Sequence, residues 1–107
     1  MEEFNAQEWI AIAIANKMLV MLKAEGMESS ILFAPHVMYQ PDEDTAFVVG
    51  TRVKTPGNEA EGAVEIEINI RDIISVFITE DQFTPHLDYD LEQPPFKGCD
   101  IFDVNTR

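Results

Sequence analysis

The sequence predicts an α+β fold in which one long N-terminal helix packs on a small antiparallel sheet of about four to five strands. Three observations support this class. A helix with signals at both ends occupies residues 6–25, alternating apolar residues follow in the middle of the chain, and the C-terminal part is acidic and interrupted by prolines. Because a chain of 107 residues has the size of one ordinary domain, we expect a single domain spanning 1–107.

The helix is expected to begin at Ala6, because the residues around that point can satisfy its first backbone donors. Asn5 can cap the first turn, and Glu8 can complete a capping box. Gly26 supplies the left-handed residue that commonly ends a helix. Apolar residues surround nearly the whole helix, which is typical of a buried element. We therefore expect a central helix wrapped by a sheet, or a helix with a spare face that docks a partner or a second copy.

Residues 30–39 and 45–54 are predicted to form a hairpin around an acidic loop. Because Pro35 cannot donate to a strand ladder, the first strand is expected to be an edge strand or an interrupted one. The clearest alternation follows over residues 63–70, where apolar and polar side chains share opposite faces. This strand is expected to be half buried and half solvated.

The alternation loses its phase at residues 71–73, which indicates a bulge or a tight corner. It resumes with Ile74, Val76 and Ile78 on one face. The remaining chain is acidic and rich in proline, but it keeps enough apolar residues to pack. We expect a docked, irregular segment with one strand near residues 86–91.

Twenty acidic residues against seven basic ones give a net charge of −13. The phosphates of DNA or RNA would repel such a surface, so direct binding of nucleic acid is not expected. The excess of acids is larger in residues 54–107 than in residues 1–53. A charge of this size indicates either solubility alone or a partner protein with a basic surface.

Cys99 is the only cysteine, which fits a reducing compartment, and the cytoplasm is the expected location. The longest apolar stretch, residues 9–22, is interrupted by a polar pair and is shorter than a bilayer-spanning helix. Glu2 and Glu3 stand where a signal peptide would carry bases. Neither a membrane span nor export is expected.

One group of residues has the spacing of a possible metal site. His86, Asp88 and Asp90 would point to the same face of a strand, and these residue types bind divalent ions. The sequence offers them no further ligand, so we favour a solvated strand face and predict no metal. The acidic residues 42–44 lack the ligand spacing of an EF-hand loop and are interpreted as a solvated loop.

The sequence holds no motif that identifies an enzyme. Cys99 could pair with His36 or His86 as nucleophile and base, but Asp100 and Asp103 disfavour its thiolate. Hydrolase, phosphate-binding, zinc-protease and dithiol motifs are missing from the sequence. We therefore predict a protein without enzymatic activity and without a cofactor.

The predicted binding residues are carboxylates that a sheet could carry in rows on its surface. They are Glu59, Glu61, Glu65, Glu67, Asp88 and Asp90. Two of them, Glu65 and Glu67, would lie about 7 Å apart on one strand face. Such rows can engage Lys and Arg side chains that otherwise hold phosphates, with an attraction that weakens as salt rises.

The leading interpretation is a non-enzymatic inhibitor that occupies the basic, nucleic-acid-binding surface of a partner, in its sharpest form by phosphate mimicry. Such a partner would be a nuclease, a restriction or CRISPR complex, or a toxin. The alternative is a self-associating assembly or chaperone-like subunit, which would use the apolar helix and the strand containing Pro35 and whose charge would serve solubility. A metal-dependent enzyme around His86, Asp88 and Asp90 is the third hypothesis.

Overall fold

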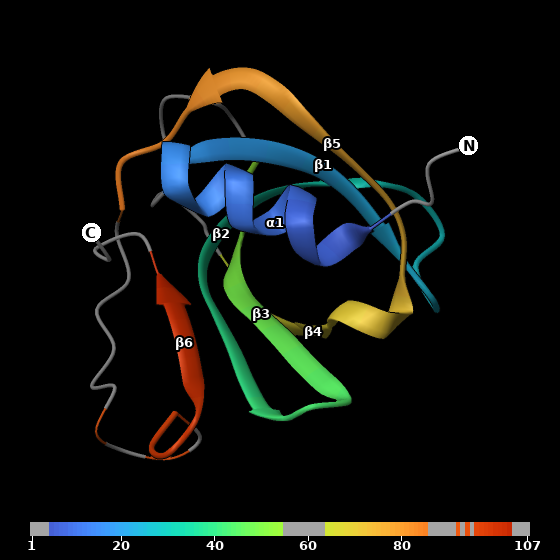
Figure 1. The fold of residues 1–107 in the computed structure, drawn as a ribbon. Helices are drawn as coiled ribbons and strands as arrows, with labels where there is room; N and C mark the ends of the chain where they lie inside the picture. The colour runs from blue at the N-terminus through green and yellow to red at the C-terminus, as the bar shows by residue number, and fades with distance from the viewer. Residues whose placement is uncertain (1–4, 55–63, 86–91, 93, 95, 104–107) are drawn as a thin grey trace.

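The computed structural model describes residues 5–54, 64–85, 92, 94 and 96–103. These residues form one α-helix, one short 3-10 helix and a six-stranded sheet (Figure 1). The elements are α1 (Ala6–Asn16), β1 (Met18–Ala24), β2 (Ile31–Asp42), β3 (Thr45–Arg52), β4 (Val64–Asn69), η1 (Ile70–Asp72), β5 (Ile73–Gln82) and β6 (Asp100–Asp103). The predicted fold class, one long helix packed on a sheet of about four to five strands, is therefore wrong: the fold is mostly antiparallel sheet, with six strands and one short helix in the described residues.

The predicted long helix over residues 6–25 is wrong beyond Asn16. The chain leaves α1 at Lys17, which takes a left-handed conformation with φ 55° and ψ 48°, and residues 18–24 form strand β1. The apolar run of residues 18–22 fits a buried strand as well as a buried helix, so its periodicity does not decide between them. β1 pairs with β2 on one side and with β5 on the other, and this pairing outweighs the helix propensity of its residues.

α1 begins at Ala6 as predicted, and of the two hydrogen bonds of the predicted capping box the structure shows the one to the Asn5 side chain. The Asn5 side chain accepts a hydrogen bond from the backbone N–H of Glu8 at 3.2 Å, while the Asn5 backbone is extended. This bond satisfies one of the amide donors that the first turn leaves open. Within the described ranges, no helix has both the length and the apolar character that crossing a bilayer requires.

The expectation of an edge strand around Pro35 is wrong, because β2 lies in the middle of the sheet. The strand order is β4-β3-β2-β1-β5, and β6 also pairs with β2. β1 pairs with residues 31–33 of β2, and β6 pairs with residues 37–40. Pro35 falls between these two stretches, where the register with β3 also shifts. The expectation of an interrupted strand is also wrong, because β2 is continuous over Ile31–Asp42, although the residue without a backbone donor does lie at an irregularity in its pairing.

The sheet curls around α1 (Figure 1). The strands at the two ends of the strand order, β4 and β5, are joined by only the three residues of η1, Ile70–Asp72. Such a short link brings the ends of these strands close together. The Glu25 backbone N–H donates to the Asp72 carbonyl at 2.8 Å and fixes the corner to the end of β1. The tight corner predicted at residues 71–73 is thus confirmed.

Apolar residues pack on both faces of the sheet. The inner cluster lies between α1 and the sheet and includes Ile14, Phe33 and Val48, which are fully buried. A second cluster, which we call the outer cluster, is formed by the buried residues Val37, Tyr39, Val49 and Phe96. Neighbouring residues of a strand point to opposite faces, so Val48 and Val49 assign the two clusters to opposite faces. Phe96 shows that part of the acidic C-terminal segment is docked, as expected, whereas residues 86–91 lie outside the described residues.

Candidate functional site

Two of the six predicted binding carboxylates lie in the described part of the chain. Glu65 and Glu67 are exposed on β4, where they pair in register with Thr51 and Val49 of β3. Val49 belongs to the outer cluster, so both carboxylates lie on the outer face of the sheet. The strand geometry places them about 7 Å apart, as the alternation predicts. The other four predicted carboxylates, Glu59, Glu61, Asp88 and Asp90, lie outside the described residues.

Glu67 also has a structural contact that the sequence did not reveal. The hydroxyl of Tyr39, from β2, donates to Glu67 Oε1. The Tyr39 ring stacks on Phe47 at 5.3 Å between centroids and meets Phe96 edge-on at 5.1 Å. Burial, followed by the hydrogen bond and the negative charge of Glu67, raises the pKa of Tyr39 well above its usual value. Glu67 is therefore held by the outer cluster, while Glu65 projects beside it.

A groove of about 440 Å³ lies along β5 at the far end of the strand order from Glu65 and Glu67. Its lining consists of Trp9 from α1 and five residues of β5, Ile74, Ser75, Val76, Phe77 and Ile78. Trp9, Ile74 and Phe77 are exposed over 45%, 55% and 70% of their surfaces. These are large apolar areas to leave in water, and contiguous patches of this kind mark interaction sites.

The sequence contained one sign of this groove. In the alternation of β5, Val76 occupies the buried position, so Phe77 necessarily points to the other face of the strand. Ile74 is exposed because the register with β1 shifts by one residue between Lys23 and Ala24, which leaves Ile74 without a partner on β1. Both of these outward positions hold exposed apolar residues, so the expectation of one apolar face over Ile74, Val76 and Ile78 missed the exposure of Ile74 and Phe77.

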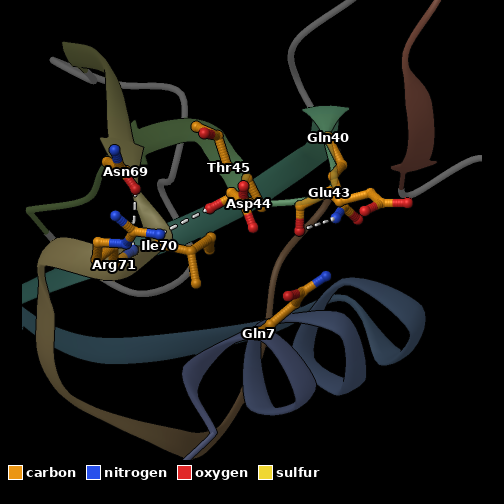
Figure 2. Close-up of a pocket in the computed structure, with 9 residues that line it drawn as sticks. Gln7, Gln40, Glu43, Asp44, Thr45, Asn69, Ile70 and Arg71 are labelled. Atoms are coloured by element: carbon orange, nitrogen blue, oxygen red, sulfur yellow. Dashed lines mark hydrogen bonds between the residues drawn. The ribbon is translucent and has the colours of Figure 1, made fainter.

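A smaller polar pocket of about 210 Å³ lies where α1, the β2–β3 turn and η1 meet (Figure 2). Figure 2 shows the side chain of Gln7 directed from α1 toward the turn. Arg71 Nη2 donates to the Asp44 carbonyl at 3.0 Å, and the Arg71 backbone N–H donates to Asn69 Oδ1 at 3.0 Å. These bonds tie the corner of the sheet to the hairpin turn, so we interpret the pocket as a structural junction.

In the acidic turn beside this pocket, one carboxylate makes a hydrogen bond within the turn itself. Asp42 Oδ1 accepts a hydrogen bond from the Asp44 backbone N–H at 2.8 Å, which closes the turn between β2 and β3. In the parts of the chain that the structure describes, no three His, Cys, Asp or Glu side chains gather into a possible metal site. The candidate ligands His86, Asp88 and Asp90 lie outside those parts.

The candidate nucleophile and one of its candidate bases pack on opposite faces of the sheet. His36 is fully buried in β2, with Nδ1 at 2.8 Å from the Ala34 carbonyl and its ring 4.9 Å from that of Phe83. Phe83 belongs to the inner cluster, whereas Cys99 packs on the outer cluster. A direct proton transfer between His36 and Cys99 is not possible in this arrangement.

Comparison with protein-family models, with curated proteins and with solved structures gave no match to this chain. The geometry of the described residues is therefore the basis for assigning a function.

Proposed function

We propose that the protein is a non-enzymatic module that binds a partner protein with a basic surface. The groove along β5 carries this proposal, because it leaves Trp9, Ile74 and Phe77 in contact with water. Covering apolar surface is favourable by roughly 25 cal/mol per Å². Aromatic anchors in pockets account for much of the affinity of protein interfaces. These side chains are well placed to anchor a partner.

The charge of the chain supports the class of partner. A net charge of −13 speeds the encounter with a basic surface and opposes the encounter with nucleic acid. Glu65 and Glu67 add two exposed carboxylates on the outer face of β4. We propose that the partner uses its basic surface to hold nucleic acid, as a nuclease, a restriction or CRISPR complex, or a toxin does. Binding would then inhibit the partner in a reducing compartment such as the cytoplasm.

Affinity capture with two sets of variants tests this proposal. The tagged protein is compared with Trp9→Ser/Phe77→Ser, which alters the groove, and with Glu65→Lys/Glu67→Lys, which reverses the charge on β4. The recovered partner is then purified and its affinity is measured at low and high salt. We expect a basic protein whose affinity falls about tenfold or more in the groove variant and also falls as salt rises.

The same purified components test inhibition. The partner's binding to a labelled oligonucleotide should weaken when the protein is added. Thermal unfolding of each variant provides the control for folding. Affinity that is indifferent to salt and to both double variants would contradict the proposal.

A further inference from the structure

We infer that the outer edge of β5 receives an extended segment of the partner, which adds to the sheet as a further strand. The segment has apolar residues at its centre and Lys or Arg at both ends. This inference rests on the proposed function and specifies how the partner is bound.

The position of β5 in the sheet supports strand addition. β5 is the last strand in the order β4-β3-β2-β1-β5 and pairs with β1 along one side. Among the described residues, no strand pairs with its other side. An edge strand presents backbone N–H and C=O groups along that side, and extended peptides bind by pairing with such groups. β5 is ten residues long, which is enough for a full ladder.

The side chains beside this edge determine the centre of the segment. Val76 belongs to the inner cluster, so Phe77 lies on the outer face of the sheet, where its register partner is Met21. Trp9 belongs to α1, which packs on the inner face, and it lines the groove together with β5. An added strand would direct alternate side chains toward Trp9 and toward Phe77. Its centre is therefore apolar on both faces.

The charges along the edge determine the ends of the segment. Asp72 immediately precedes β5, while Glu80 and Asp81 lie near its other end, and all three are exposed. The apolar centre of β5 thus has carboxylates at both ends. Lys23 lies opposite Ser75 on β1 and is a base beside the middle of the groove. Lys or Arg at the two ends of the added segment would meet the carboxylates and avoid Lys23.

The same charges argue against a second copy of this chain as the occupant. In an antiparallel pairing of two β5 strands around Val76 and Phe77, Asp72 of each copy would lie opposite Asp81 of the other. Like charges directly opposite each other destabilise a strand pair. The net charge of −13 on each copy adds to this repulsion. A segment of a different protein with basic ends has neither cost.

The test uses a synthetic peptide with an apolar centre of five residues and two lysines at each end. Its affinity for the full chain is measured by fluorescence anisotropy. One control peptide has glutamates in place of the lysines. Another has N-methyl groups on alternate residues, which remove backbone donors and keep the side chains and charges. We expect the lysine peptide to bind and both control peptides to lose about tenfold or more in affinity.

Two variants of the protein locate the binding site. Phe77→Lys changes the groove, and Val64→Lys changes an apolar residue of β4 that is exposed to a similar degree, 56%. We expect the first variant to weaken peptide binding about tenfold or more and the second to change it less than about twofold. Amide NMR shifts should change along β5 on titration and stay unchanged along β4.

The results separate this inference from the proposed function. The inference is overturned if the lysine peptide does not bind, if the N-methylated peptide binds equally well, or if the two variants behave alike. A dimer in light scattering that Phe77→Lys abolishes would overturn it in favour of a second copy. If the peptide fails while capture of the partner still requires Trp9 and Phe77, strand addition is wrong and the proposed function stands. If capture is also indifferent to those residues, the proposed function fails as well.

Discussion

The strands at the two ends of the sheet order, β4 and β5, differ in what they present to solvent. β4 alternates Glu65 and Glu67 with Ile66 and Ile68, so its outer face carries carboxylates. β5 carries Phe77 at the corresponding outward position, and the register shift beside Ala24 exposes Ile74. Charged side chains protect an edge strand from unwanted pairing. The contrast shows that the outer face of β4 exposes carboxylates, whereas β5 exposes apolar side chains.

The first way to sharpen this comparison is to test how tightly β3, the strand that pairs with β4, is packed against β2. Gly50 of β3 pairs with Ile66 of β4 and with Pro35 of β2. A Cβ at Gly50 would lie 2.1 Å from the Ala34 carbonyl oxygen, which is a backbone atom and cannot move aside cheaply. We expect Gly50→Ala to lower the free energy of unfolding by about 3 kcal/mol or more, measured by urea denaturation.

The matched change on the other side is Ser75→Ala in β5. Its effect should stay within about 0.5 kcal/mol, because Ser75 lines an open groove. Equal losses in the two variants would contradict the view that the sheet is tightly packed at β3 and tolerant at β5.

The second comparison lies within β5 and separates folding from binding. Val76 is buried in the inner cluster, so Val76→Ala should cost about 2 kcal/mol of stability. Phe77 is 70% exposed, so Phe77→Ala should change stability by less than about 0.5 kcal/mol. Thermal unfolding of both variants measures the difference. A large loss of stability in Phe77→Ala would mean that its ring serves the fold, and the case for a binding groove would weaken.

The third and smallest expected effect concerns the bond that anchors Glu67. Tyr39→Phe removes the hydroxyl that donates to Glu67 and should cost about 1 to 2 kcal/mol at neutral pH. Glu65→Gln, two residues away on the same face, should change stability by less than about 0.5 kcal/mol. If both variants lose the same amount, the hydrogen bond contributes nothing specific to the β4 side.

The pKa of Tyr39 adds a pH dependence to this prediction. The folded chain holds the Tyr39 proton more tightly than the unfolded chain, in which tyrosine has a pKa of about 10. Above this pH the native state binds more protons than the unfolded state, so stability falls as pH rises. The contribution is fully present below about pH 10 and is lost above it. Urea denaturation at alkaline pH should show a smaller fall in Tyr39→Phe than in the unchanged protein.

The parts of the fold that the sequence predicted are those determined by neighbouring residues. The start of α1 depends on Asn5 and its contact with Glu8, and the alternation of β4 is visible over six residues. The corner at η1 appears as a break in that alternation. Each of these features is local, so a short stretch of sequence contains the information that specifies it.

The parts that were missed depend on contacts between distant segments. Residues 18–22 are uniformly apolar, and only pairing with both β2 and β5 makes residues 18–24 a strand. Lys17 ends the helix in a left-handed conformation for which glycine or asparagine would have been the usual sign. The exposure of Phe77 depends on which face of β5 the helix covers. Alternation indicates two faces of a strand but not which of them will be buried.

The shared edge of β2 has a consequence for the order in which the protein can fold. β1 and β6 pair with successive stretches of the same edge of β2, yet they are separated by almost the whole described chain. During synthesis, residues 37–40 therefore keep unpaired backbone groups on that side until β6 has emerged. An open edge of this kind is a site for wrong pairing between nascent chains. The short strand β6 is therefore the last strand to pair with β2, and its pairing completes the sheet.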